Sequence, residues 1–188
     1  MSTLLDEVDV RRFTVTEYYR MADAGVIDMD ERVELIDGVI CRMSPEDSRH
    51  AAGIEIARQV LAAKLGNRFG LRMRHPLTLN QATEPEPDVA VVEDPNPRAY
   101  ANKHPTSAVL VIEVARSSLA KDLGTKANQY ASARIPEYWV ENLVDDCLEV
   151  LREPEDGEYT SRTTLRQRDV VRPRCTPDVE IRVDELLP

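Results

Sequence analysis

Cysteine, aromatic residues and long apolar runs are all scarce in this sequence of 188 residues. The three cysteines, Cys41, Cys147 and Cys175, are far apart and odd in number, so they match neither a disulfide framework nor the ligand spacing of a zinc site. No stretch approaches the roughly 20 apolar residues that span a bilayer. Residues 1–12 contain no apolar signal core. We therefore expect a cytoplasmic protein with reduced thiols and no membrane association.

Positive charge is also in short supply. The chain has 24 lysines and arginines against 34 aspartates and glutamates, which gives a formal net charge of −10 at pH 7. This balance argues against a protein that coats nucleic acid through bulk electrostatics, but it permits local basic patches and an acidic site for a divalent cation. Aromatic residues, 5% of the chain, are not interleaved with basic ones, so the sequence does not indicate base stacking.

The remaining composition is that of an ordinary soluble domain, with 42% hydrophobic and 31% charged residues. The length suits a single domain over residues 1–188 with a sizeable core. We expect this core to span about residues 14–152, followed by a C-terminal hairpin and strand within 153–188. Neither an internal repeat nor a low-complexity linker divides the chain.

Local signals predict an N-terminal helix and a hairpin. Thr14 and Glu17 have capping-box spacing, which predicts a short helix that begins there. Asp37-Gly38 lies between two apolar stretches and is typical of a two-residue type I′ turn, so residues 32–43 should form a hairpin. Alternation along its first strand places Glu34 on the same face as a basic neighbour.

Helical and strand patterns follow one another through the rest of the chain. His50 lies in the first turn of a predicted helix, where the positive helix end disfavours imidazolium, so we expect a neutral ring unless a carboxylate is near. The apolar periodicity predicts helices over about residues 48–65 and 119–134, strands near 76–79 and at 89–92, 108–115 and 137–140, a hairpin within 147–165, and a last strand over 179–183.

One carboxylate interrupts the most apolar stretch of the chain. Residues 108–115 read Ala-Val-Leu-Val-Ile-Glu-Val-Ala, a Val- and Ile-rich run too short for a helix and typical of a strand buried on both faces. An ionised Glu113 inside this strand loses several kcal/mol of hydration unless nearby charge offsets the loss. We therefore expect Glu113 to meet a cation, a metal ion or a shared proton.

Asp88 and Lys126 are the natural partners for Glu113. Asp88 lies at the mouth of the buried strand 89–92, and Lys126 lies in the helix that follows Glu113. Two carboxylates at the ends of adjacent buried strands can converge on one hard cation, and Mg²⁺ prefers oxygen ligands and keeps several waters. A lysine beside them can orient or deprotonate an attacking water, or stabilise charge in the transition state. These residue types suit the hydrolysis of a phosphodiester.

An ordered set of short motifs surrounds these residues: Glu34-Leu35-Ile36-Asp37-Gly38, Met43-Ser44-Pro45, His50, Glu86-Pro87-Asp88-Val89-Ala90-Val91-Val92, Ile112-Glu113-Val114, Asp122, Lys126, Tyr130 and Ile135-Pro136-Glu137-Tyr138-Trp139. In this order they resemble the Uma-type restriction endonuclease family, which belongs to the PD-(D/E)xK nuclease superfamily. The resemblance covers about residues 14–152 and is specific as a set rather than in any single motif.

The match to the superfamily motif is incomplete at its lysine. Pro87-Asp88 matches the first half of the motif, and Glu113 matches the acidic residue of the second half. The position of the strict lysine is occupied by Ala115. The resemblance therefore implies that the lysine is displaced to the following helix, which makes Lys126 the candidate by position.

The resemblance implies an α/β fold, with a restriction-endonuclease-like mixed β-sheet flanked by helices and preceded by an N-terminal helix and β-hairpin. It implies a metal-dependent endonuclease that hydrolyses DNA, with Mg²⁺ or Mn²⁺ on Asp88 and Glu113 and with Lys126 near the attacking water. Glu34 and His50 would then be further site residues that tune the metal. A homodimer is also implied, because cutting both strands usually requires two sites.

Two other interpretations remain open. One is a catalytically inactive binding or regulatory module with the nuclease fold, which the net charge of −10 and Ala115 favour. The other is a hydrolase that acts on RNA or on a smaller phosphoester. Each residue also has a purely structural interpretation: Glu113 could pair with Lys126 or Arg116, and Lys126 with Asp122.

Overall fold

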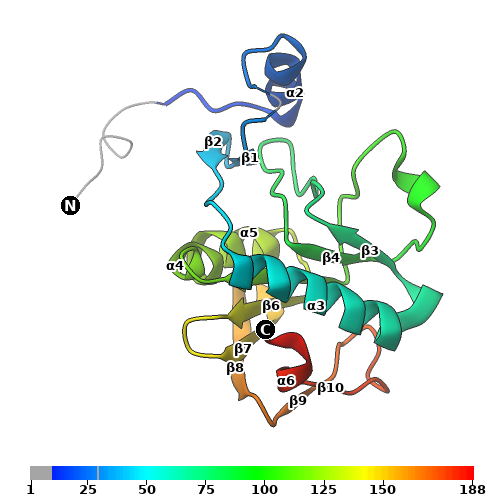
Figure 1. The fold of residues 1–188 in the computed structure, drawn as a ribbon. Coiled ribbons are helices and arrows are strands. Elements are labelled where there is room, and N and C mark those ends of the chain that lie inside the picture. Colours follow the sequence, from blue (N-terminus) through cyan, green and yellow to red (C-terminus); the bar gives the residue numbers. More distant parts are fainter. Residues whose placement is uncertain (1–9, 29) are drawn as a thin grey trace.

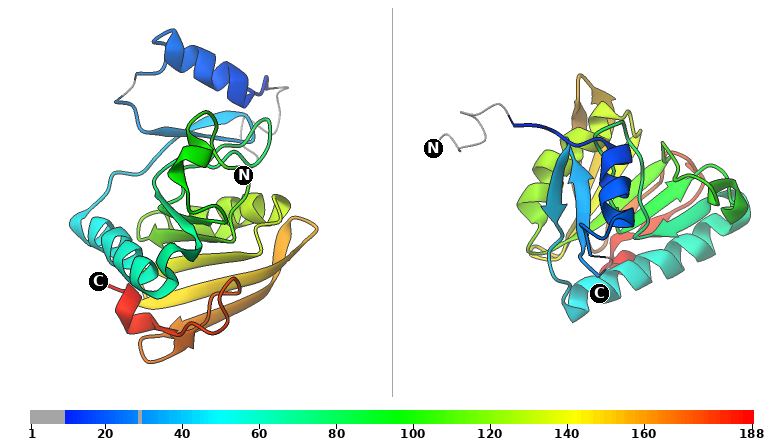
Figure 2. Two further views of the ribbon diagram at one scale, coloured as in Figure 1. Left: turned by 90° about the vertical axis from the view of Figure 1, so that its right-hand side faces the viewer. Right: turned by 90° about the horizontal axis from the view of Figure 1, so that it is seen from above.

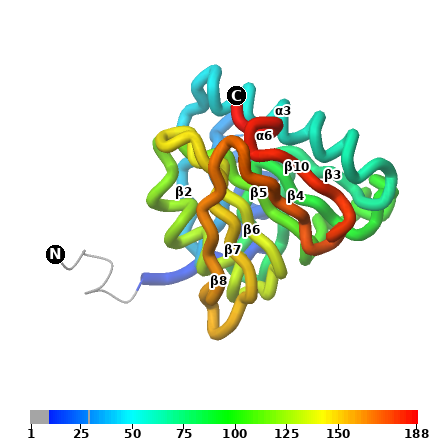
Figure 3. The backbone as a smooth tube through the Cα atoms, turned by 90° about the horizontal axis from the view of Figure 1, so that it is seen from below, coloured from blue at the N-terminus to red at the C-terminus, as the bar shows by residue number. Residues whose placement is uncertain are grey.

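A six-stranded mixed β-sheet forms the centre of the fold (Figure 1). The computed structural model describes residues 10–28 and 30–188, so the expectation for residues 1–9 lies outside them. The strand order is β3-β4-β5-β6-β7-β8; β5 and β6 are parallel and the neighbouring pairs are antiparallel (Figure 3). The strands are β3 (Gly70–Met73), β4 (Val89–Val92), β5 (Leu110–Ala115), β6 (Glu137–Asn142), β7 (Cys147–Glu155) and β8 (Glu158–Arg166).

Helix α3 (Ser48–Leu65) covers one face of this sheet (Figure 1). It begins at the cap residue Asp47, whose carboxylate accepts two backbone N–H groups of the first turn. Its buried residues Ala57, Leu61 and Leu65 belong to one apolar cluster with Ile112 and Trp139 of the sheet. Near the C-terminus, β9 (Val170–Val171), β10 (Ile181–Arg182) and α6 (Val183–Leu186) complete this apolar layer.

The opposite face is covered by the helical crossover that joins the parallel strands β5 and β6. The crossover consists of α4 (Leu119–Lys121), a π-helical turn η3 (Asp122–Lys126) and α5 (Ala127–Ser132). Tyr130 of α5 packs against Val111 and Val140 of the sheet. The sheet therefore has an apolar layer on each side, as a restriction-endonuclease-like mixed sheet requires.

The N-terminal helix and hairpin form a separate small layer beside one end of the main sheet (Figure 2). This layer comprises α2 (Val15–Asp23), β1 (Val33–Ile36) and β2 (Val39–Arg42). The predicted capping box of α2 is present. Backbone hydrogen bonds between Leu35 and Glu84 tie β1 to the loop before β4, with Glu84 N–H donating to Leu35 at 2.7 Å.

Most predicted elements are confirmed, and three need correction. The prediction of a strand near residues 76–79 is wrong. The edge strand is β3, which lies earlier in the chain and pairs with β4. The last predicted strand is reduced to β10, because Val183 begins α6. The predicted helix 119–134 is interrupted by η3. Two single-turn 3₁₀ helices, η1 (Gly66–Arg68) and η2 (Pro97–Tyr100), lie in connections.

The three cysteines are free thiols. Among the described residues, no helix is both long and apolar enough to cross a membrane.

The hairpin turn depends on Gly38 for a steric reason that can be tested. Gly25 and Gly38 have nearly the same positive φ, 70° and 71°, but only Gly38 is crowded: an added Cβ would lie 2.6 Å from the Cβ of Arg12 and 2.9 Å from backbone atoms of Phe13. At Gly25 such a Cβ meets nothing within 4 Å. Gly25→Ala should cost only the left-handed strain of about 1–2 kcal/mol. Gly38→Ala should cost a further 1–3 kcal/mol or so through overpacking.

Urea unfolding of both variants measures this difference. Equal destabilisation by Gly25→Ala and Gly38→Ala would show that residues 12 and 13 do not pack on the turn.

Candidate active site

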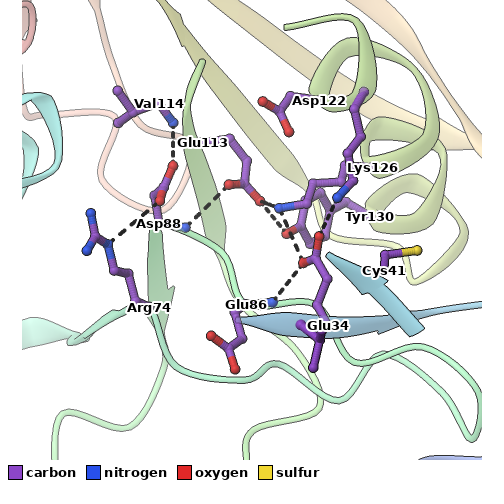
Figure 4. Close-up of polar contacts among 12 residues, drawn as sticks. Glu34, Cys41, Arg74, Glu86, Asp88, Glu113, Val114, Asp122, Lys126 and Tyr130 are labelled. Carbon is purple, nitrogen blue, oxygen red and sulfur yellow. Dashed lines mark hydrogen bonds and ion pairs between the residues drawn. The ribbon is translucent and has the colours of Figure 1, made fainter. Parts of the chain in front are cut away.

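Glu113 lies fully buried at the centre of the site (Figure 4). Its Oε1 accepts hydrogen bonds from Lys126 Nζ at 2.8 Å and from the Tyr130 hydroxyl at 2.7 Å. Its Oε2 faces the backbone N–H of Asp88 at 3.4 Å. The energetic cost of a carboxylate in this strand is therefore offset by one cation and by hydrogen bonds from two elements.

The crossover directs Lys126 and Tyr130 to the same carboxylate oxygen. Lys126 ends the π-helical turn and Tyr130 follows four residues later in α5, so both side chains lie on the helix face toward the sheet. π-helical turns occur frequently at functional sites, where they change which side chains face inward. Here Asp122 and Lys126, at the two ends of the turn, are both buried.

Lys126 links Glu113 to a second buried carboxylate, that of Glu34. Its Nζ lies 3.5 Å from Glu34 Oε2. Burial alone would lower the pKa of Lys126, but the carboxylates of Glu113 and Glu34 raise it above its ordinary value, so the ammonium form is maintained. Lys126 is therefore a buried cation shared between β5 of the main sheet and β1 of the N-terminal hairpin.

Glu34 enters the site from β1 and holds a second lysine. Its Oε1 accepts a hydrogen bond from Lys121 Nζ at 2.6 Å, and its Oε2 accepts one from the backbone N–H of Glu86 at 3.3 Å. Burial raises the pKa of Glu34, but Lys126 and Lys121 together lower it below its ordinary value. Glu34 is therefore a carboxylate with cations on both sides, and not the partner of its sequence neighbour Arg32, which pairs with Glu46.

Asp88 is held between β5 and the first turn of α3. Its Oδ2 accepts the backbone N–H of Val114 at 2.8 Å, and His50 Nε2 lies 3.2 Å from the same oxygen. Arg74 Nε lies 4.0 Å from Oδ1 (Figure 4). The hydrogen bond to Asp88 raises the pKa of His50 despite partial burial. We expected a neutral His50 ring unless a carboxylate is near. Asp88 is such a carboxylate, so this expectation does not apply.

The electrostatics of Glu113 and Asp88 favour the addition of positive charge. Burial raises the pKa of Glu113 above its ordinary value; Lys126 opposes this rise, while the like charge of Asp88 adds to it. Carboxylate oxygens are the hard donors that Mg²⁺ prefers, so the chemistry of this pair fits such an ion. Among residues 10–28 and 30–188, no group of three or more His, Cys, Asp or Glu side chains is arranged to hold a metal. Water and substrate would have to supply the remaining ligands.

A small cavity of about 40 Å³ connects these groups. This volume accommodates a few atoms the size of a water molecule. All five residues expected at the site line it: Glu34, His50, Asp88, Glu113 and Lys126. The fold thus gathers side chains from β1, α3, the residue before β4, β5 and η3 around one space, although they are spread over more than ninety positions of the sequence.

The sequence reasoning left four other residues out of the site. Tyr130 could have been included, because it lies four residues after Lys126 on the same helix face. Lys121 and Asp122 line the cavity, but the π-helical turn changes the helical phase and removes the spacing signal. No pattern in the sequence indicated that the Glu141 side chain is buried.

Glu141 is a buried carboxyl on the α3 side of the sheet. It is 0% exposed, and neither oxygen has a hydrogen-bond partner among residues 10–28 and 30–188. Its register neighbours are Val114 and Leu148, and Oε2 lies 3.5 Å from the position that a Cβ on Gly53 would take. Burial raises the pKa of Glu141 well above its ordinary value, and Asp88 adds to the rise. Burial therefore favours the neutral acid form of Glu141 in the folded protein.

These features define an α/β protein of the nuclease-like class, with a mixed sheet and a carboxylate–lysine cluster at the ends of adjacent strands. The chain belongs to the Uma2 family, described as "Putative restriction endonuclease", whose model matches residues 15–184. The fold and the family that the sequence motifs implied are thereby confirmed.

A solved structure supports the fold. A nuclease of the DUF820 group from Anabaena variabilis, itself described as putative, is 13% identical and superposes with a TM-score of 0.70 over 93% of this chain and 97% of that one. The type IIG restriction endonuclease BpuSI is 16% identical, with a TM-score of 0.40 over 63% of this chain and 14% of that one, a likeness too low to carry an argument. No curated protein matches the sequence.

The neutral Glu141 predicts a specific pH dependence of stability. The unfolded chain loses the proton above the ordinary pKa of 4.5, whereas the folded protein keeps it. The stability contributed by the protonated side chain is therefore complete below that value and declines as the pH rises toward the folded-state pKa, by about 1.4 kcal/mol per pH unit. Glu141→Gln removes this decline, so its stability relative to wild type should grow between about pH 5 and pH 8.

Urea unfolding across this pH range is the measurement, with the exposed Glu158→Gln as the matched control. A stability difference between wild type and Glu141→Gln that does not vary with pH would show that Glu141 is ionised in the folded state.

Proposed function

We propose that this protein is a metal-dependent endonuclease that hydrolyses DNA phosphodiester bonds, with Mg²⁺ or Mn²⁺ bound by Asp88 and Glu113. The proposal rests above all on the buried pair of Glu113 and Asp88, with the Lys126 ammonium 2.8 Å from Glu113 Oε1. Burial and, to a smaller extent, the charge of Asp88 raise the pKa of Glu113, and a cation between the two carboxylates would offset both effects. Membership of a restriction endonuclease family supports DNA as the substrate.

Each residue of the site has a defined part in this mechanism. The bound cation would polarise a phosphoryl oxygen and lower the pKa of a water that it holds. Tyr130 and Lys126 fix Glu113 Oε1, which leaves Oε2 directed toward Asp88. His50 and the Val114 N–H fix the carboxylate of Asp88 in the same way. The Lys126 ammonium lies next to Glu113, where it can orient the attacking water and stabilise negative charge.

Glu34 keeps Lys126 in place from the opposite side. Without this second carboxylate, the lysine would be fixed only by the residue that it helps to orient. Groups that hold the direct ligands in position commonly tune metal affinity and activity, and we assign this role to Glu34 and His50.

Cleavage of both DNA strands requires two such sites. We therefore propose that the working form is a homodimer, a common arrangement for symmetric substrates. Sedimentation of the full chain with and without duplex DNA measures this directly.

The central test removes each acidic ligand and compares it with a buried carboxylate elsewhere. Removing a residue that only hydrogen-bonds a metal ligand typically lowers metal affinity roughly 10–100-fold. Asp88 and Glu113 are proposed as direct ligands, so Asp88→Asn and Glu113→Gln should weaken Mg²⁺ or Mn²⁺ binding by more than this. Both should also abolish nicking of supercoiled plasmid. Glu149→Gln is the control, because Glu149 is equally buried but pairs with Arg162 on β8.

Isothermal titration calorimetry and gel analysis of plasmid forms give the two measurements. The nuclease proposal is wrong if the wild type binds no divalent ion and neither substitution changes nicking. DNA binding that persists without any cleavage would identify an inactive module of the same fold.

A further inference from the structure

Two lysines approach Glu34, and they differ in how far they can reach solvent. Lys121 Nζ lies 2.6 Å from Oε1 and Lys126 Nζ lies 3.5 Å from Oε2. The Lys126 side chain is 6% exposed, whereas the Lys121 side chain is 34% exposed. The Lys121 side chain is therefore more accessible to a ligand from solvent than the Lys126 side chain, although both line the cavity.

Lys126 forms ion pairs with two buried carboxylates, whereas Lys121 forms an ion pair with one. Lys126 neutralises two buried carboxylates, Glu113 at 2.8 Å and Glu34 at 3.5 Å. Moving it toward a ligand would leave both charges buried and uncompensated, which is strongly unfavourable. Lys121 has one such pair, and its side chain is 34% exposed, so its release is less costly.

Glu34 remains compensated when Lys121 leaves it. Its Oε2 keeps the backbone N–H of Glu86 at 3.3 Å and the Lys126 ammonium. A phosphate oxygen offers an ammonium group the same partner chemistry as a carboxylate oxygen, with a charge-assisted hydrogen bond. Lys121 also lines the cavity that contains Asp88 and Glu113, so an anion bound by it would lie at the proposed reaction site.

We propose that Lys121 binds a phosphate oxygen of the DNA backbone by exchanging its ion pair with Glu34, while Lys126 keeps its ion pairs with Glu113 and Glu34 beside the attacking water. This proposal rests on the proposed nuclease function and adds to it an accessible cation that holds the substrate. The alternative is that Lys121 serves only to fasten the N-terminal hairpin to the crossover.

The binding test compares Lys121→Met with Lys64→Met. Lys64 is a matched control, because it is 36% exposed and pairs with Glu185 at 3.2 Å on the far end of α3. The probe is a duplex oligonucleotide with phosphorothioate linkages, and its affinity is measured by fluorescence anisotropy at several salt concentrations. Lys121→Met should weaken binding roughly 10–100-fold, as expected for one charge-assisted hydrogen bond.

The salt dependence identifies the lost contact as a phosphate contact. One fewer neutralised phosphate should make the slope of log affinity against log salt shallower by about 0.9. Lys64→Met should keep the wild-type slope, and Lys121→Arg should largely restore it, because arginine also binds phosphate. A Lys121→Met protein with wild-type affinity and slope overturns the proposal.

Reductive methylation of the wild-type protein, read by mass spectrometry, tests the same claim without any substitution. Lys121 should react in the free protein and be protected by the duplex, while Lys126 stays unmodified in both. Equal reaction of Lys121 with and without the duplex rejects the phosphate contact, even if Lys121→Met fails to fold.

The two proposals fail in distinguishable ways. A wild type that neither binds nor nicks DNA rejects the nuclease function and this contact together. A wild type that nicks DNA, with Lys121→Met indistinguishable from it, rejects the contact alone.

Discussion

The site depends on the compensation of one buried carboxylate. Glu113 lies in the middle of an apolar strand, where an isolated negative charge is strongly disfavoured. The structure offsets that charge with the Lys126 ammonium, the Tyr130 hydroxyl and the Asp88 backbone N–H. These partners come from the crossover and from β4. The same requirement therefore fixes the position of the crossover relative to the sheet.

The N-terminal hairpin belongs to this arrangement although it lies outside the main sheet. Glu34 from β1 pairs with Lys121 and Lys126, so two cations of the crossover are balanced by a carboxylate that comes from a different layer. Gly38 allows the tight turn that brings β1 and β2 together beside Phe13. The local turn chemistry of the hairpin thus contributes directly to the charge balance of the site.

Much of this organisation could be predicted from the sequence, because it depends on local signals. The capping box at Thr14, the Asp37-Gly38 turn and the apolar strand around Glu113 each have a short-range cause, and each is present. The five predicted site residues surround one cavity. They could be predicted together because their motifs follow one another along the chain as in the family that the sequence resembles. Their chemical roles remain predictions.

The features that could not be predicted depend on tertiary structure. The π-helical turn shifts the helical phase between Lys121 and Lys126, so no regular spacing indicates that both reach Glu34. Glu141 faces the apolar underside of α3, an environment that its neighbours in sequence do not reveal. The edge strand β3 is only four residues long and contains Gly70, so its formation depends on antiparallel pairing with β4 rather than on a strong local signal.

The most direct test of the account is a crystal structure of the full chain grown with Mn²⁺, using anomalous scattering to locate the metal. The account predicts an anomalous peak between the carboxylates of Asp88 and Glu113, with Lys126 still bound to Glu113. A manganese peak elsewhere, or none at saturating Mn²⁺, would contradict the claim that the charge of Glu113 serves to bind a metal ion.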